Sequence, residues 1–151
     1  MRRFMFSATL VVAAIALVLS ATAANAAEER PFSATTEVTQ QSSQSDGQTV
    51  HLVYSGTATA THLGSTSAVA VVDIDLTTGV ATGVVTLTKK DVDSITIEFV
   101  QVFDPAQAAY VGEYQITGGT GKFEGAGGSG AFVNMAGDGT RIGKYDGTII
   151  Y

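Results

Sequence analysis

The sequence predicts an all-β protein built as a single closed eight-stranded antiparallel β-barrel, and three observations support this prediction. Val, Ile and Thr, whose branching at Cβ favours the pleated strand, make up 39 of the 125 residues from 27 to 151. Turn residues recur between the apolar stretches, and no stretch keeps the 3.6-residue period of an amphipathic helix. Eight strands in this length give about 15 residues for each strand and its turn, which suits long barrel strands better than the roughly 8–12 of a sandwich.

The start of the chain has the three parts of a secretory signal peptide. Two arginines follow the first Met, residues 8–19 form an apolar run, and Ala24-Asn25-Ala26 is a small-x-small cleavage site. An apolar run of about 12 residues is shorter than the roughly 20 that span a bilayer. We therefore predict a cleaved signal peptide over residues 1–26 and a β-barrel domain over residues 27–151, in a secreted or periplasmic protein.

The first four predicted strands are separated by polar and glycine-containing turns. They cover residues 32–40, 48–61, 67–76 and 80–88. A polar loop over residues 41–47 ends in Asp46-Gly47, and Thr77-Thr78-Gly79 turns the third strand into the fourth. Alternate residues of the third strand are apolar, which predicts that one of its faces points inward.

The last four predicted strands cover residues 94–103, 110–117, 129–136 and 140–151. A charged loop over residues 89–93 precedes the first of them, and Asp104-Pro105 ends it because Pro lacks the N–H that a ladder needs. Asp138-Gly139 is a strong hairpin signal before the last strand. That strand would be an aggregation hazard if unpaired, and an even number of strands lets it pair with the first. Closure of the sheet is therefore favoured over an open sandwich.

The charge balance excludes several kinds of partner. Residues 27–151 hold 14 acidic and six basic side chains, a net charge of about −8. Nucleic acid and an anionic membrane surface would both be repelled, so we expect neither partner after the signal peptide is cleaved. The chain has no Cys, which excludes disulfides and thiolate sites. The sequence does not exclude association into a homo-oligomer.

Glycine is concentrated late in the chain, where 12 of the 36 residues from 112 to 147 are Gly. A dinucleotide-binding fingerprint does not fit, because Glu124 stands where a glycine is needed and no helix follows. A P-loop does not fit either, because Phe123 follows Gly121-Lys122 where Ser or Thr is needed. We therefore interpret the cluster as backbone geometry at tight connections.

The segment ITGGTGKFEGAGGSG, residues 116–130, resembles a segment shared by plant dirigent proteins, allene oxide cyclases and bacterial secreted allene oxide cyclase barrel-like proteins. The resemblance implies a calycin-like, closed eight-stranded barrel, related in shape to lipocalins, whose interior holds a small apolar molecule. It implies that Phe123 plugs the barrel and that a turn is formed by Gly118, Gly119, Gly121 and Gly125. Dirigent proteins guide radical coupling and the cyclases close a fatty-acid epoxide. None of their functional acidic or arginine residues aligns with this chain, so no activity and no cofactor is carried over.

Other polar patterns do not predict a metal site. Asp73-x-Asp75 and Asp91-x-Asp93 are interpreted as a solvated strand face and a hairpin loop. His51 lies in the predicted strand 48–61 and His62 directly follows it; their odd separation of 11 residues would point them to opposite faces, which makes a poor metal pair. A Ser-His-Asp arrangement stays open because it is recognised by geometry, although no G-x-S-x-G motif supports one.

Several aromatic and polar residues of the strands could line a pocket at one mouth of the barrel. Tyrosine suits this position because it combines an apolar ring with a polar tip. The candidate lining residues are Tyr54, Tyr114, Phe123, Asn134, Arg141 and Tyr145.

We expect an exported barrel that binds a small apolar molecule without converting it. Two alternatives stay open: a structural or cell-surface interaction protein with Thr-rich faces, and an isomerase or cyclase acting on a lipid-derived or aromatic ligand. The second alternative needs a polar or titratable group inside the cavity. Eight strands is also the size at which side chains can just fill a barrel, which would count against ligand binding.

Overall fold

The strands close into one antiparallel barrel in a computed structural model that describes residues 27–151. The predicted signal peptide lies outside the described residues. The strands are β1 Glu29–Ser45, β2 Thr49–Ala60, β3 Gly64–Asp75, β4 Ala81–Lys89, β5 Asp93–Asp104, β6 Ala109–Thr120, β7 Gly127–Ala136 and β8 Thr140–Ile150. The only helical element described is a 3-10 turn, Gly121–Phe123, and no helix in residues 27–151 is long and apolar enough to cross a membrane. The predicted fold class is confirmed.

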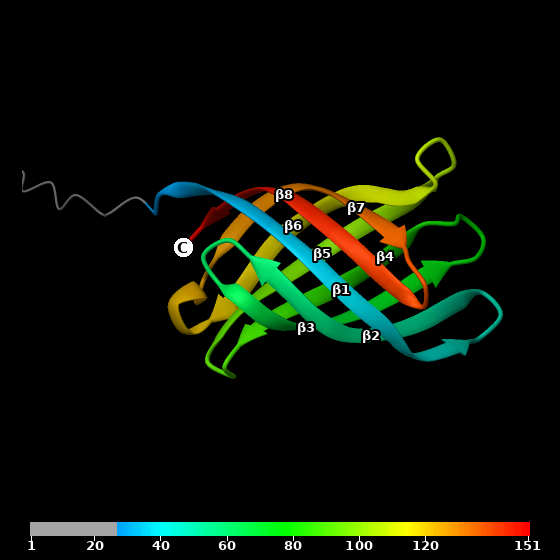
Figure 1. Cartoon of the computed structure of the whole chain (residues 1–151). Helices are drawn as coiled ribbons and strands as arrows, with labels where there is room; N and C mark the ends of the chain where they lie inside the picture. Colours follow the sequence, from blue (N-terminus) through cyan, green and yellow to red (C-terminus); the bar gives the residue numbers. More distant parts are fainter. Residues whose placement is uncertain (1–26) are drawn as a thin grey trace, which may run out of the picture.

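Closure depends on the pairing of β1 with β8, which Figure 1 shows side by side. The register runs from Glu29 opposite Ile150 to Thr39 opposite Thr140. The apolar last strand is therefore paired on both sides, with β1 and with β7. A closed sheet has no free strand edge, which removes the aggregation hazard of an unpaired strand.

Two strands run further than predicted. The expected polar loop over residues 41–47 shortens to 46–48, because β1 continues to Ser45 after a bulge and pairs Ser42 with Val53. Strand β6 continues to Thr120 after a second irregularity, where Gly118 pairs with Thr96. In both places backbone pairing decides the boundary, although the side chains carry turn-like chemistry.

The barrel has two different ends (Figure 1). The terminal end carries the connections over residues 61–63, 90–92 and 121–126 and the start of β1. The loop end carries the connections over residues 46–48, 76–80, 105–108 and 137–139. Seven large side chains with almost no exposed surface lie at or toward the terminal end: Phe32, Leu63, Leu87, Ile95, Ile97, Phe123 and Ile149. The terminal end is therefore filled by apolar side chains.

Phe123 lies at this filled end and has no exposed surface. Its ring centroid is 4.8 Å from that of Tyr151, which accepts a 2.8 Å hydrogen bond from Arg30. Lys122 donates to the carbonyl oxygen of His62, at 2.8 Å. Of the four glycines expected to form the turn here, Gly121 and Gly125 have left-handed backbones with φ of 61° and 73°.

Interior aromatic rings face glycines on the neighbouring strand. Phe99 is directly opposite Gly83, and Phe132 is directly opposite Gly112. A Cβ added at Gly112 would lie 2.9 Å from the Phe132 ring and 2.0 Å from the carbonyl oxygen of Val100. The glycines therefore leave the space that the rings occupy.

We predict that Gly112→Ala lowers the free energy of unfolding by about 1–3 kcal/mol, because the methyl group has to displace both a ring and a backbone carbonyl. Chemical denaturation measures the change. Gly127→Ala is the matched control, since no atom lies within 4 Å of a Cβ added there. Equal effects of the two substitutions would contradict the assigned role of Gly112.

Phe123→Ala should cost about 3–5 kcal/mol of stability, because it leaves a cavity at a position without solvent access. Phe103 is 51% exposed, so Phe103→Ala should cost much less. Thermal and chemical denaturation of the two variants compare these losses. A small loss for Phe123→Ala would show that the terminal end does not depend on this ring.

Candidate ligand site at the loop end of the barrel

A cavity of about 40 Å³ lies inside the barrel toward the loop end. One water molecule needs roughly 10–15 Å³ measured in this way, whereas pockets for drug-sized ligands measure about 300–1,000 Å³. The cavity therefore has room for a few waters or for one end of a small ligand. A larger molecule would have to project from the loop end or displace side chains.

The walls of the cavity differ in chemistry. Strands β1 to β4 contribute mainly apolar side chains: Val38, Leu52, Ala70, Val72, Ile74 and Val85. Strands β5 to β8 contribute most of the polar ones: Gln101, Tyr110, Asn134, Arg141 and Tyr145. Phe99, Thr36 and Tyr54 complete the lining. The site is therefore amphipathic from one wall to the other.

Two side-chain oxygens on the polar wall lack a hydrogen-bond partner among the described residues. They are Oε1 of Gln101 and Oδ1 of Asn134, and both atoms are buried. A buried polar atom left unpaired costs roughly 1–3 kcal/mol. A donor from water or from a ligand in the cavity would remove this penalty.

Arg141 places a positive charge on the same wall. Its guanidinium carbon lies 5.4 Å from the centroid of the Tyr110 ring, a cation–π contact. The only side-chain ion pair within residues 27–151 joins His51 and Asp73, so no carboxylate lies within 4 Å of Arg141. Arg141 can therefore donate hydrogen bonds to an acceptor in the cavity.

The tyrosines next to the cavity are held in the neutral form. Burial raises the pKa of Tyr114 to about 12, and the charge of Asp146 adds to the shift. Burial also raises the pKa of Tyr145 well above its usual range, with a further contribution from Tyr114. The two rings meet edge to face, with centroids 5.4 Å apart. Near neutral pH both hydroxyls therefore keep their protons and do not act as bases.

The structure brings four of the six predicted lining residues together: Tyr54, Asn134, Arg141 and Tyr145. Tyr114 is buried behind Tyr145 and does not line the cavity, and Phe123 lies at the other end of the barrel. Gln101 was missed because its neighbours are apolar. Strict alternation from Ile97 and Phe99 is the signal that could have placed it inside.

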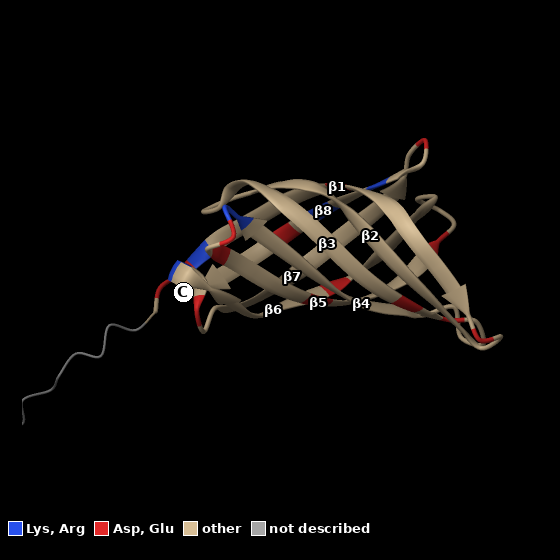
Figure 2. Ribbon diagram, turned by 90° about the horizontal axis from the view of Figure 1, so that it is seen from below, with Lys and Arg blue, Asp and Glu red and all other residues tan. Residues whose placement is uncertain are grey.

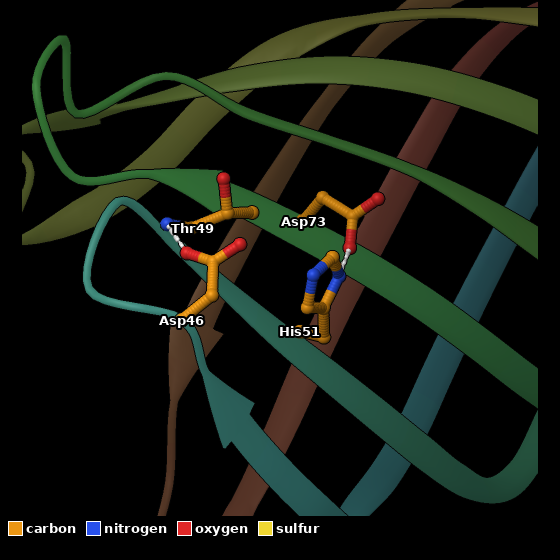
Figure 3. A network of polar contacts seen from close by, with 4 residues as sticks. All are labelled: Asp46, Thr49, His51 and Asp73. Atoms are coloured by element: carbon orange, nitrogen blue, oxygen red, sulfur yellow. Dashed lines mark hydrogen bonds and ion pairs between the residues drawn. The ribbon is translucent and has the colours of Figure 1, made fainter.

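A His–Asp pair lies on the outer surface, away from the cavity (Figure 3). His51 Nδ1 contacts Asp73 Oδ1 directly across the β2–β3 register, and both side chains are about half exposed. Nearby, Asp46 accepts hydrogen bonds from the backbone N–H groups of Gln48 and Thr49, which lower its pKa. In the part of the chain described, no hydroxyl is hydrogen-bonded to His51. The pair is therefore a cross-strand contact and not part of a catalytic triad.

Two further carboxylates of these patterns, Asp75 and Asp93, have local partners. Asp75 accepts hydrogen bonds from the backbone and side chain of Thr77, at 2.8 and 2.5 Å, and its pKa is lowered as a result. Asp93 accepts a hydrogen bond from the backbone N–H of Lys122. Residues 27–151 contain no group of three or more His, Asp or Glu that could hold a metal ion.

Tyrosine ionisation should report on the buried rings. The raised pKa means that the fold favours neutral Tyr114, so this contribution to stability is present below pH 10 and is lost as pH rises toward about 12. The tyrosinate absorbance of wild type minus that of Tyr114→Phe should titrate near pH 12. The same difference in urea-unfolded protein should titrate near pH 10. A midpoint near 10 in the folded protein would contradict the burial of this hydroxyl.

Comparisons of the chain with protein-family models, with curated proteins and with solved structures found no match.

Proposed function

We propose that the protein binds a small amphipathic molecule at the loop end of the barrel and does not convert it chemically. The apolar part of the ligand lies against β1 to β4, and its polar head faces β5 to β8. The two unpaired oxygens of Gln101 and Asn134 carry the proposal, because a buried site keeps such atoms at a cost in stability. The small cavity limits the enclosed part to a head group and a few carbons.

The polar wall supports a head group that both donates and accepts hydrogen bonds. Gln101 Oε1 and Asn134 Oδ1 require donors, while the Arg141 guanidinium requires an acceptor. A primary amide provides an NH₂ group and a carbonyl oxygen in one planar unit. We therefore propose an amide-like or hydroxy-acid head on a short apolar chain.

The ionisable side chains that line the cavity support binding of the ligand without chemical conversion. These are Arg141 and three tyrosines, Tyr54, Tyr110 and Tyr145, with no carboxylate or imidazole among them. General acid–base catalysis near neutral pH works best with a group whose pKa lies near that pH. Of these tyrosines, Tyr145 has its pKa shifted further from neutrality. An isomerase or cyclase activity is therefore the weaker proposal.

Export and family membership stay predictions. The signal peptide predicted over residues 1–26 would place the barrel outside the cytoplasm, where a carrier meets ligands from the surroundings. The resemblance to allene oxide cyclase and dirigent proteins fits an apolar ligand in a barrel, and we propose no catalytic step from it.

Hexanamide and 2-heptanone test the head-group preference, because they have nearly the same shape and only the amide donates hydrogen bonds. NMR titrations should give a higher affinity for hexanamide relative to 2-heptanone in wild type. Gln101→Leu should lower this ratio about fivefold, the effect of one hydrogen bond. It should also raise the free energy of unfolding by about 1 kcal/mol, because an unpaired buried oxygen is removed.

Gln115→Leu is the matched control, since Gln115 is exposed on the outer surface. It should leave the affinity ratio unchanged. If neither compound shifts resonances of the cavity wall, or if Gln101→Leu leaves the ratio unaltered, the proposed site is wrong.

A further inference from the structure

A hollow of about 900 Å³ lies on the outside of the barrel, over β3 to β7. We call this the outer hollow and define it by three valines, Val71, Val84 and Val100, and three carboxylates, Asp73, Glu98 and Glu113. The valines are 48%, 37% and 51% exposed. Short side chains of β4 and β7 leave the surface open around them: Thr82, Ser129 and Ala131.

The cross-strand register makes these six residues one continuous surface. Val71 lies opposite Val84, and Val84 lies opposite Glu98. Val100 lies opposite Glu113 on the next pair of strands. Directly opposed side chains in a sheet are about 5 Å apart, so each valine borders a neighbouring apolar or acidic side chain. Apolar and anionic groups therefore alternate across the outer hollow.

This side of the barrel is strongly acidic. Strands β3 to β7 contain six carboxylates, Asp73, Asp75, Asp93, Glu98, Asp104 and Glu113, and a single basic residue, Lys89, at the end of β4. In Figure 2, red segments lie on this side of the barrel, and the middle of β4, β5 and β6 carries no blue. None of the three carboxylates of the outer hollow forms an ion pair with a basic residue other than His51 within residues 27–151.

The topology decides how a partner can attach here. Because the barrel is closed, no free strand edge is available for β-strand addition. A partner must therefore contact side chains on the face of the sheet. A second copy docked through the same surface would bring the three carboxylates of each molecule together, which opposes association at neutral pH.

We propose that the outer hollow docks a segment of another protein in which basic and apolar side chains alternate. Lys or Arg of the partner lies against Glu98 and Glu113, and its apolar side chains cover Val84 and Val100. The valines and carboxylates that contact the partner point outward and do not line the cavity inside the barrel, whereas Phe99 borders both sites.

Short labelled peptides of equal length test the proposal by fluorescence anisotropy with the full chain. The probes are an alternating Lys–Val peptide, an alternating Lys–Ser peptide and an alternating Glu–Val peptide. The Lys–Val peptide should bind most tightly, and its affinity should fall when the salt is raised from about 50 to about 200 mM, because exposed charges are screened. The Glu–Val peptide should not bind.

Two double variants separate charge from apolar contact. Glu98→Gln/Glu113→Gln and Val84→Thr/Val100→Thr should each weaken Lys–Val binding about fivefold. The matched controls are Glu37→Gln/Glu124→Gln and Val92→Thr, which change exposed residues away from the outer hollow and should have no effect.

Four results would overturn the proposal. They are absence of Lys–Val binding, equal binding of Lys–Ser, undiminished binding to both double variants, and self-association at neutral pH that Val84→Thr/Val100→Thr abolishes. The last result would assign the outer hollow to a second copy of the chain.

Discussion

The volume inside an eight-stranded barrel is the constraint on which the other features depend. Eight strands enclose just enough space for side chains, so a large ring on one strand requires a missing side chain on the next. Phe99 against Gly83 and Phe132 against Gly112 meet this requirement directly. The rings of Phe132 and Tyr145 then stack with centroids 5.2 Å apart. Each of these glycines thus provides the space that the aromatic ring on the neighbouring strand fills.

This arrangement also explains why the two ends of the barrel differ. At the terminal end, branched and aromatic side chains such as Leu63 and Phe123 fill the interior and leave no exposed surface. Toward the loop end, the inward positions of β5 to β8 change from apolar to polar, and Gln101 and Asn134 remain partly unpaired. A barrel selected for stability alone would place apolar residues there, because pairing is incomplete and burial of amides is costly.

The sequence predicted the architecture well because strand patterning is local. Branching at Cβ, alternation and turn residues identified eight strands, and their even number predicted closure. The ends of β1 and β6 were harder to predict, because bulges near Gln41 and Thr117 let backbone pairing continue through residues that are typical of turns. Gln101 was not predicted as a lining residue, because its burial depends on which face of β5 points inward and on how far the barrel extends. The glycines were interpreted as connections, although some are strand positions opposite a ring that is distant in sequence, such as Gly112 opposite Phe132 and Gly147 opposite Phe32.

Because successive side chains of a strand point to opposite faces of the sheet, the barrel wall presents two chemically distinct surfaces, one inside and one outside. On β5, Phe99 and Gln101 point into the barrel, whereas Glu98 and Val100 point outward. A one-residue shift in register would exchange the inward and the outward side chains of the strand. Neither site could therefore change its position on the sheet without disrupting the core. Because interior packing fixes this register, it also fixes the spacing of valines and carboxylates outside. The order of the outer surface follows from the fit of rings and glycines inside.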